Sequence, residues 1–183
     1  MGLLTIIRKQ KLKDREKRVL ILGLDNAGKS TVVRRVLGKS SEHLAPTMGF
    51  EISSVEHNGT NVNFWDVGGQ QTLRAFWFNY FDQLDALVWV VDVAQLERLS
   101  EVFRELDKVL RNERVNGVKL LLLLNKVDLV EESVVEATQR KVVTDLELDA
   151  YGAEGEKWKI LPCSAVTGRN IDVGMDWLTR SDY

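Results

Sequence analysis

The residues from Gly23 to Ser30 restrict how this chain can fold more than any other feature. They read G-L-D-N-A-G-K-S, which matches the pattern G-x-x-x-x-G-K-[ST], and they directly follow the apolar run Val19–Leu22. In this pattern a buried strand leads into a glycine-rich loop and then a helix, and the N–H groups of the loop surround a phosphate. The sequence therefore predicts an α/β domain with a phosphate site after its first strand.

Each residue type in this loop has a chemical use. Glycines let the backbone N–H groups turn inward on the α- and β-phosphates of a nucleotide, and the helix that begins near Gly28 adds the positive end of its dipole. Lys29 is predicted to reach the β- and γ-oxygens, and Ser30 to ligate Mg²⁺, which prefers oxygen ligands. The predicted nucleotide contacts of this loop are Gly23, Asp25, Asn26, Ala27, Gly28, Lys29, Ser30 and Thr31.

The composition suits a single globular domain. With 183 residues, 44% of them hydrophobic, the chain can bury one core, and we expect an N-terminal helix over 1–17 followed by one domain over 18–183. A formal net charge of −2 argues against a general nucleic-acid binder. Cys163 is the single cysteine, a predicted core thiol, so no internal disulfide is expected. Without an apolar run of about 18 residues or a secretion signal, a cytoplasmic monomer is predicted.

Apolar runs along the chain predict the sheet. Most are separated by segments with helical periodicity, which indicates a six-stranded, mostly parallel sheet with helices on both faces. Two of them are joined through Asn58-Gly59, a strong hairpin signal, so one antiparallel hairpin is expected at an edge. The runs are Val19–Leu22, Ile52–Val55, Val62–Trp65, Leu87–Val91, Val118–Leu124 and Ile160–Leu161.

Two segments between the phosphate loop and the middle of the chain can sense a third phosphate. Asp66, at the carboxyl end of a predicted strand, is expected to hold the magnesium shell through water. Gly69 has no side chain to block a γ-phosphate, so its N–H can bond that group, and Gln70 is placed to orient an attacking water. Thr47, the only threonine of the segment Ala45–Phe50, is the candidate for a second magnesium hydroxyl.

The run N-K-V-D at residues 125–128 indicates which base is bound. Guanine presents N1–H and N2–H₂ donors together, which one carboxylate can accept and adenine cannot supply, so Asp128 is predicted to select guanine. Asn125 either serves the O6/N7 side of the base or ties its loop to the phosphate loop. The stem of Lys126 is expected to pack on the base plane. The N–H groups predicted to reach O6 of guanine belong to Ser164, Ala165 and Val166.

The N-terminus predicts a short amphipathic helix. The apolar residues of the segment G-L-L-T-I-I, residues 2–7, precede a basic stretch that ends at Arg18. Gly2 suggests N-myristoylation, but the motif requires Ser or Thr at position 6, where Ile6 stands, so we do not predict acylation. The apolar face can bury in a bilayer interface or in a groove of the protein itself. Without an acyl chain, the internal groove is favoured, with membrane contact at most peripheral.

With these motifs assembled, the chain resembles the Arf family of small GTPases, and most closely its Arf-like two branch, over nearly its whole length. The resemblance implies a P-loop small GTPase fold and a switch between GDP and GTP forms, in which the hairpin from Phe50 to Trp65 slides when GTP binds and expels the N-terminal helix. The passages that carry the resemblance are residues 1–6, 22–29, 46–50, 65–70, 79–81, 89–92 and 163–168.

The resemblance also implies partners of that branch. These are a tubulin-folding cofactor that links the family to microtubules and the cytoskeleton, a prenyl-binding carrier of lipidated proteins, a small helical binder and a GTPase-activating protein. Three departures stand out: Val127 replaces a usual Gln, residues 129–158 diverge, and the last helix stops early, at Asp182-Tyr183. The second and third weaken any transfer of partners that touch this end of the molecule.

Slow GTP hydrolysis is the expected activity. An arginine near the γ-phosphate is worth roughly 10³–10⁵ in rate, and the loop from Leu24 to Ala27 contains none, so an outside protein must supply one. Three other functions remain open: a binding module that carries GTP and hardly cycles, a different Arf-like branch acting in membrane traffic, and an ATP-using P-loop kinase. Gln70 disfavours the first and Asp128 the last.

Overall fold

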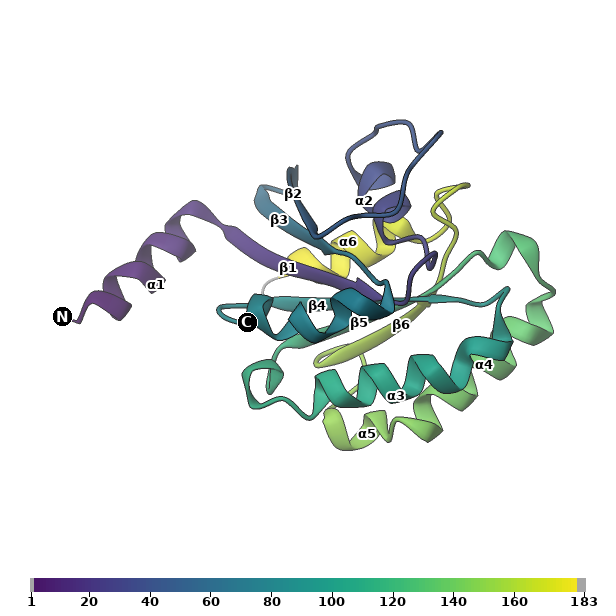
Figure 1. The fold of residues 1–183 in the computed structure, drawn as a ribbon. Helices are drawn as coiled ribbons and strands as arrows, with labels where there is room; N and C mark the ends of the chain where they lie inside the picture. Colours follow the sequence, from purple (N-terminus) through teal and green to yellow (C-terminus); the bar gives the residue numbers. More distant parts are fainter. Residues whose placement is uncertain (1, 181–183) are drawn as a thin grey trace.

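Figure 1 shows a twisted sheet with helices on both faces, in a computed structural model that describes residues 2–180. The sheet has six strands. The strand order is β2-β3-β1-β4-β5-β6, and every neighbouring pair is parallel except β2 with β3. The six predicted strands are thereby confirmed. Their bounds are β1 (Glu16–Gly23), β2 (Phe50–His57), β3 (Thr60–Val67), β4 (Ala86–Asp92), β5 (Lys119–Asn125) and β6 (Trp158–Pro162).

The antiparallel hairpin lies at one edge of the sheet, as predicted. Its two turn residues, Asn58 and Gly59, have φ angles of 51° and 72°, which is the left-handed conformation that a tight hairpin turn requires and that these residue types adopt easily. The turn also contacts the C-terminal helix. His57 Nε2 and Asn58 Nδ2 lie 2.7 Å and 3.0 Å from Asp176 Oδ1. The edge hairpin is therefore held at its tip as well as along β1.

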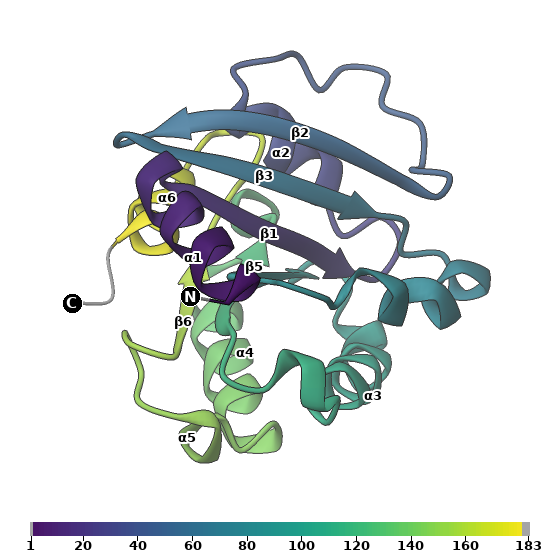
Figure 2. The same ribbon diagram turned by 90° about the vertical axis from the view of Figure 1, so that its left-hand side faces the viewer.

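The helices cover the sheet in two layers, which Figure 2 shows from the side of the N-terminal helix. Along β1 the side chains alternate, so that Val19 and Ile21 face α2 and α6, whereas Leu20 and Leu22 face α3, α4 and α5. Strands buried on both faces explain the nearly continuous apolar runs. The helices are α2 (Lys29–Val36), α3 (Leu99–Leu110), α4 (Glu132–Asp145), α5 (Leu148–Tyr151) and α6 (Ile171–Thr179).

Short 3₁₀ segments connect several of these elements. The longest, η1, leads from the predicted phosphate-sensing segment toward β4, and it buries Trp77 against Trp89 of that strand in an edge-to-face contact. Trp77 Nε1 donates to the Gly68 carbonyl at 3.0 Å, so the helix also fixes the start of its own loop. The four segments are η1 (Gln71–Tyr80), η2 (Leu96–Arg98), η3 (Glu113–Val115) and η4 (Val127–Leu129).

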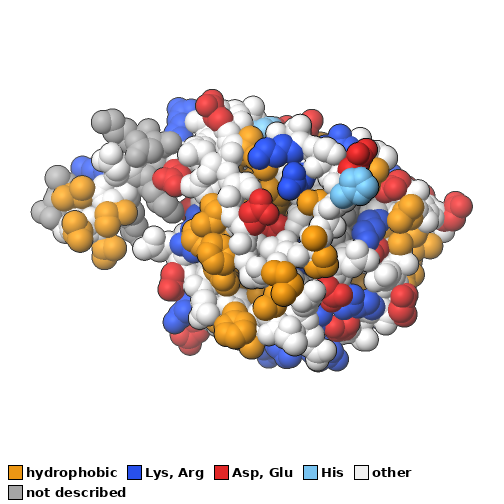
Figure 3. All heavy atoms as spheres, turned by 45° about the horizontal axis from the view of Figure 1, so that its top comes forward, with side chains coloured by type: hydrophobic (Ala, Val, Ile, Leu, Met, Phe, Trp, Pro, Cys, Tyr) orange, Lys and Arg blue, Asp and Glu red, His pale blue; other side chains and the backbone are white. Residues whose placement is uncertain are grey.

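The predicted N-terminal helix is present as α1 (Leu3–Asp14), and it stands away from the body of the molecule (Figures 1 and 3). Leu3 and Leu4 are 75% and 77% exposed. The sequence favoured a groove of the protein as the place where the apolar face is buried, but in this conformation the helix does not lie in such a groove. The single residue Arg15, with a φ of 43°, connects α1 to β1 and sets the outward direction. Among residues 2–180, no helix has the length and apolarity needed to cross a bilayer.

The segment that diverges from the resembled family still closes the core. Tyr151 Oη donates to the Val118 carbonyl at 2.6 Å, and burial raises the pKa of this phenol to about 12. Trp158 Nε1 donates to the Gly152 carbonyl at 2.8 Å, and the Trp158 side chain is buried. The divergence therefore changes the outline of this side without opening the hydrophobic core beneath it.

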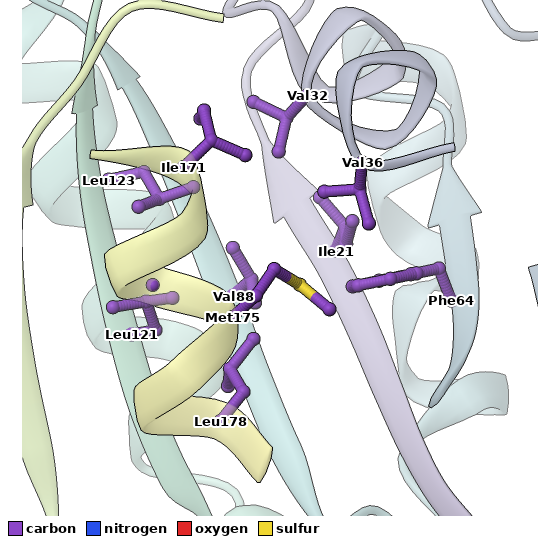
Figure 4. A pocket seen from close by; sticks show the side chains of 11 residues that line it. Ile21, Val32, Val36, Phe64, Val88, Leu121, Leu123, Ile171, Met175 and Leu178 are labelled. Carbon is purple, nitrogen blue, oxygen red and sulfur yellow. The ribbon is translucent and has the colours of Figure 1, made fainter. Parts of the chain in front are cut away.

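A small apolar cavity of about 20 Å³ lies between α2, α6 and the sheet (Figure 4). Gly174, in the middle of α6, borders it. A methyl group added at Gly174 would lie 3.3 Å from Leu121 Cδ2 and 3.6 Å from Leu161 Cδ1, both of which are ends of flexible side chains. The core here accepts one methyl group if the Leu121 side chain moves by a few tenths of an ångström toward the cavity, and the helix carries a residue with poor helix propensity.

We predict that Gly174→Ala stabilises the protein by about 0.5–1 kcal/mol, because alanine loses less backbone entropy in a helix and its methyl fills apolar space. For a chain of this size that corresponds to a melting temperature roughly 1–4 °C higher. Gly38→Ala is the matched control. Gly38 also has open space around it but a φ of 66°, so alanine is strained there and should lower the melting temperature. A lower melting temperature for Gly174→Ala would show that Leu121 cannot move.

Candidate functional site

The loop that follows β1 forms one wall of a cleft at the carboxyl edge of the sheet. Asn26 and Gly28 take φ angles of 62° and 100°, and a Cβ at Gly28 would collide with the side-chain amide of Asn125. Helix α2 begins immediately afterwards, so its first N–H groups and its positive dipole end face the cleft. The cleft has a volume of about 340 Å³, and the segments that line it are residues 25–26, 28–31, 44–47 and 68–70.

Lys29 lies at the floor of this cleft and is only 6% exposed. Its ammonium donates to the carbonyls of Gly23 at 3.0 Å and Leu24 at 2.7 Å. Burial lowers its pKa to about 8, against the opposing attraction of the Asp66 carboxylate. A cation held in a dry site with few countercharges strongly favours a bound anion, because the anion restores the solvation that burial removed.

Three oxygen-bearing side chains from three different segments meet beside the loop. Ser30 Oγ lies 2.9 Å from Thr47 Oγ1 and donates to Asp66 Oδ2 at 2.5 Å. Burial raises the pKa of Asp66, while the hydrogen bond from Ser30 works in the opposite direction. The second carboxylate oxygen, Asp66 Oδ1, is buried without a hydrogen-bond partner among the described residues.

This donor set suits a hard divalent cation such as Mg²⁺. Hydroxyl and carboxylate oxygens are the ligands that Mg²⁺ prefers, and an unsatisfied buried carboxylate oxygen is an acceptor for a water in its shell. Among residues 2–180 there is no group of three or more His, Cys, Asp or Glu side chains that could hold a metal alone. Phosphate oxygens and water would therefore have to complete the coordination.

The segment after Asp66 packs directly onto the loop after β1. A Cβ at Gly69 would collide with the Gly23 carbonyl oxygen and with Lys29 Nζ, so only glycine fits this approach. The N–H of Asp25 donates to the Gly69 carbonyl at 3.1 Å. Gln70 follows and lines the cleft. The structure thus brings together the predicted Gly69 and Gln70 with the predicted phosphate loop.

The Thr47 segment is tied to the same place. The N–H of Gly68 donates to the Gly49 carbonyl at 2.9 Å, and a Cβ at Gly68 would lie 2.5 Å from the Thr47 carbonyl oxygen. Both segments that were predicted to sense a γ-phosphate are therefore packed against each other and against the phosphate loop.

A cluster of four charged residues beside the loop was not predicted. Arg74, which is almost fully buried, donates to the Gly69 carbonyl and to Asp25 and Glu101. Arg98 donates to the carboxylates of Asp25 and Glu101 at 2.9 Å and 3.1 Å. The pKa values of both carboxyls are lowered, and in each case the hydrogen bond from Arg98 is the largest cause. Only the i, i+3 spacing of Arg98 and Glu101 is visible in the sequence.

Asn125, at the end of β5, connects the phosphate loop with the loop after β6. It is buried, its amide donates to the Ala27 carbonyl at 3.0 Å, and its Oδ1 accepts from the N–H of Ala165 at 3.0 Å. Of the two roles left open by the sequence, the structure shows the one that ties this loop to the phosphate loop. Lys126 adds a second tie, since its Nζ lies 2.7 Å from both the Asn26 carbonyl and Asp92 Oδ2.

The predicted base-reading carboxylate is exposed and oriented. Asp128 Oδ1 accepts from Ser164 Oγ at 2.7 Å, which places the predicted reader of N1–H and N2–H₂ next to the loop after β6. The N–H of Ser164 donates to the Arg169 carbonyl, and that of Ala165 to Asn125. Both N–H groups were predicted to reach O6 of guanine. Because each already has a protein acceptor, it could bind O6 only by sharing its hydrogen between two acceptors. Next to them, Cys163 is buried, and burial raises the pKa of its thiol to about 12, which fits the predicted core role.

Comparison with known proteins agrees with this geometry. Residues 3–181 match the ADP-ribosylation factor (Arf) family. The chain belongs to the Arf family. It is 44% identical to ADP-ribosylation factor-like protein 2 of Arabidopsis thaliana, with 98% of this chain and 95% of that protein covered. The protein of the same name from Drosophila melanogaster is also 44% identical, with 97% and 94% covered.

A solved small GTPase shares the fold. The Arl6 (BBS3) small GTPase of Trypanosoma brucei, solved with the nucleotide analogue GppNp, superposes with a TM-score of 0.71 at 26% identity over 89% of this chain and 95% of that one. The resemblance to the Arf-like two branch and the small GTPase fold are thereby confirmed. As an Arf-family GTPase, the chain is a GTP hydrolase that binds guanine nucleotides.

The charged cluster predicts a pH-dependent contribution to stability. Because the folded pKa values of Asp25 and Glu101 lie below the ordinary values of 3.8 and 4.5, these groups stabilise the fold above those values and cease to do so as the pH falls through the lowered ones. The stability lost in Arg98→Met should therefore be greatest near pH 7 and shrink below about pH 4. Urea unfolding from pH 7 to pH 3 measures it.

Arg104→Met is the matched control, because Arg104 lies on the neighbouring α3 and is exposed. It should change the free energy of unfolding by no more than about 0.5 kcal/mol at any pH. A loss in Arg98→Met that stays constant down to pH 3 would show that its ion pairs do not shift the two carboxyl groups.

Proposed function

We propose that this Arf-family GTPase is a GDP/GTP switch of the Arf-like two type, which binds Mg²⁺ through Ser30 and Thr47 and hydrolyses GTP slowly. The observation that carries the proposal is the meeting of Ser30, Thr47 and Asp66 beside the cleft after β1. Asp128 lies on the loop after β5, which Asn125 ties to the phosphate loop. Two separate segments can then report one γ-phosphate, which is the requirement for a switch.

The residues of the cleft act mainly by position and charge. Lys29 and the first N–H groups of α2 bind the phosphate oxygens, and the N–H of Gly69 is assigned to the γ-phosphate. Gln70 orients the attacking water. Mg²⁺, when bound, supplies positive charge to the phosphate oxygens. At the base end, Asp128 accepts from guanine, while Asn125 and Lys126 fix the loops around it.

Slow turnover follows from where the arginines lie. Among the described residues that line the cleft there is no arginine. Arg74 and Arg98 are the arginines that contact the phosphate loop at Asp25, and both are held by carboxylates. Neither is available to stabilise charge on a γ-phosphate without losing those pairs. An activating protein that supplies an arginine would raise the rate by roughly 10³–10⁵.

The position of α1 supports a coupling between nucleotide and N-terminus. In this structure Thr47 and Asp66 both contact Ser30, and α1 exposes Leu3, Leu4, Ile6 and Ile7. That combination is the one expected for a GTP form in which the β2–β3 hairpin has moved and the helix has been expelled. In the GDP form, the face with Leu3, Leu4, Ile6 and Ile7 would dock on the body.

The proposed partners follow from the resemblance to the Arf-like two branch, and an exposed aromatic surface is the proposed place where they bind. They are the tubulin-folding cofactor, the prenyl-binding carrier and the GTPase-activating protein implied by the resemblance, and the protein would act in the cytoplasm with peripheral membrane or cytoskeletal contact. Phe50, Trp65 and Tyr80 form a triangle with ring centroids 5.4–6.1 Å apart, and Phe50 is 50% exposed. This aromatic triangle joins both phosphate-sensing segments, so a partner bound there would detect the nucleotide.

Gln70→Leu should keep GTP binding but lose most of the hydrolysis, because leucine fills the same volume without orienting water. Single-turnover release of phosphate from GTP-loaded protein measures the rate, which we expect to fall at least tenfold. Gln71→Leu is the matched control, since Gln71 is the exposed neighbour and does not line the cleft. An unchanged rate in Gln70→Leu would remove that residue from its assigned role.

Removing residues 1–13 should raise the affinity for GTP relative to GDP and speed spontaneous exchange, because the docked helix favours the GDP form. Each large aliphatic side chain contributes roughly 1.5–3 kcal/mol when fully buried, enough for several of them to bias a two-state equilibrium. Dissociation of a fluorescent GDP and of a fluorescent GTP analogue measures both effects. In the full-length chain, Leu4→Ser should act in the same direction and Gln10→Ala should not. If both rates match those of the intact protein, α1 is not part of the switch.

A further inference from the structure

Arg35, in the last turn of α2, contacts the loop after β6 through a forked arrangement. Its Nε donates to the Ala165 carbonyl at 2.9 Å, and its Nη2 donates to the Val166 carbonyl. Figures 1 and 2 both show this loop, drawn in yellow, beside α2. The residues that these two hydrogen bonds join are 130 and 131 positions apart in the sequence. A planar guanidinium suits two successive carbonyls, whereas a lysine ammonium presents a single centre.

The carbonyls that Arg35 holds fix the directions of the neighbouring N–H groups. A trans peptide is planar, and its C=O and N–H bonds point in opposite directions. With the Ala165 carbonyl turned toward α2, the N–H of Val166 must point away from α2. The hydrogen bonds among residues 2–180 include none donated by this N–H, whereas those of Ser164 and Ala165 have protein acceptors.

The rest of the loop is held from the opposite side. Asn125 Oδ1 accepts from the N–H of Ala165, and Asp128 Oδ1 accepts from Ser164 Oγ, which in turn accepts from the N–H of Thr167 at 3.1 Å. None of these hydrogen bonds is accepted by the Ala165 carbonyl, which belongs to the peptide between Ala165 and Val166. Among the hydrogen bonds of the described residues, the one from Arg35 Nε is the bond that holds the carbonyl of that peptide.

We propose that Arg35 is a positioning residue for base recognition: by holding the carbonyls of Ala165 and Val166 against α2, it aims the N–H of Val166 at the 6-carbonyl of the guanine base. The proposal rests on guanine-nucleotide binding in this cleft. In the base recognition expected from the sequence, the loop after β6 reads the 6-position and Asp128 reads N1–H and the 2-amino group. Arg35 would act on the first of these two contacts only.

The test compares three diphosphates that differ at one position of the base, each displacing a fluorescent GDP analogue. GDP and 6-thio-GDP differ only in the acceptor at position 6, since sulfur accepts hydrogen bonds weakly. GDP and IDP differ only in the 2-amino group. Arg35→Ala should reduce the preference for GDP over 6-thio-GDP by about threefold to tenfold, the factor that one neutral hydrogen bond provides. The preference for GDP over IDP should stay as it is in the wild type.

Two further variants separate positioning from general loss of structure. Arg35→Lys keeps the charge and can reach one carbonyl at a time, so its preference for GDP over 6-thio-GDP should lie between wild type and Arg35→Ala. Arg34→Ala, on the same helix, removes an arginine that does not contact the loop after β6 among the described residues and instead donates to the Ser40 carbonyl at 3.4 Å. It should leave both preferences unchanged.

If Arg35→Ala lowers both preferences equally, or lowers neither, Arg35 only supports the fold and the proposal is wrong. The affinities of the wild-type protein for ADP and GDP are measured first. If they are equal, the protein does not select guanine and the proposed function itself is wrong. If GDP is preferred, the comparison of variants tests the role of Arg35 alone.

Discussion

The nucleotide site depends most on the side chain of Asn125. The site is assembled from loops that follow β1, β3, β5 and β6, and the loops by themselves have no reason to keep a fixed separation. One buried amide connects three of them, because it donates to Ala27 in the phosphate loop and accepts from Ala165 in the loop after β6. Removing either bond would leave a buried polar atom unsatisfied, which costs about 1–3 kcal/mol and makes intermediate geometries unfavourable. The distance between the phosphate end and the base end is therefore fixed before any ligand arrives.

The phosphate end is organised by a second constraint, the burial of opposite charges. Burial lowers the pKa of Lys29 to about 8 and raises the pKa of Asp66, so each group is held where its charged form is poorly solvated. Each attracts the other, and Asp66 retains one buried oxygen that has no hydrogen-bond partner among the described residues. A polyanion together with a divalent cation would satisfy both groups at once. This explains why the phosphates and the cation should bind with strong mutual dependence.

Much of this arrangement was predictable because its signals are local. The residue types of the phosphate loop, the Asn58-Gly59 turn and the apolar strands each specify a conformation within about ten residues, and all of these were confirmed. The cluster of Asp25, Arg74, Arg98 and Glu101 was missed, since its members come from separate segments and charged residues are common on any surface. The direction of α1 was missed as well. It depends on the single backbone conformation at Arg15, for which the sequence carries no clear signal.

The hydrogen bonds between the hairpin tip and α6 couple any movement of the β2–β3 hairpin to the C-terminal helix. His57 and Asn58 both bond Asp176, a residue more than a hundred positions later in the chain. The hydrogen bond from His57 lowers the pKa of that carboxyl, so the bonds favour its charged form. If β2 and β3 shift lengthwise against β1, their tip must leave α6 or drag it. The C-terminal helix α6 is therefore an anchor for the β2–β3 hairpin. The free energy of the hydrogen bonds to Asp176 contributes to the difference in stability between any two registers of this hairpin against β1.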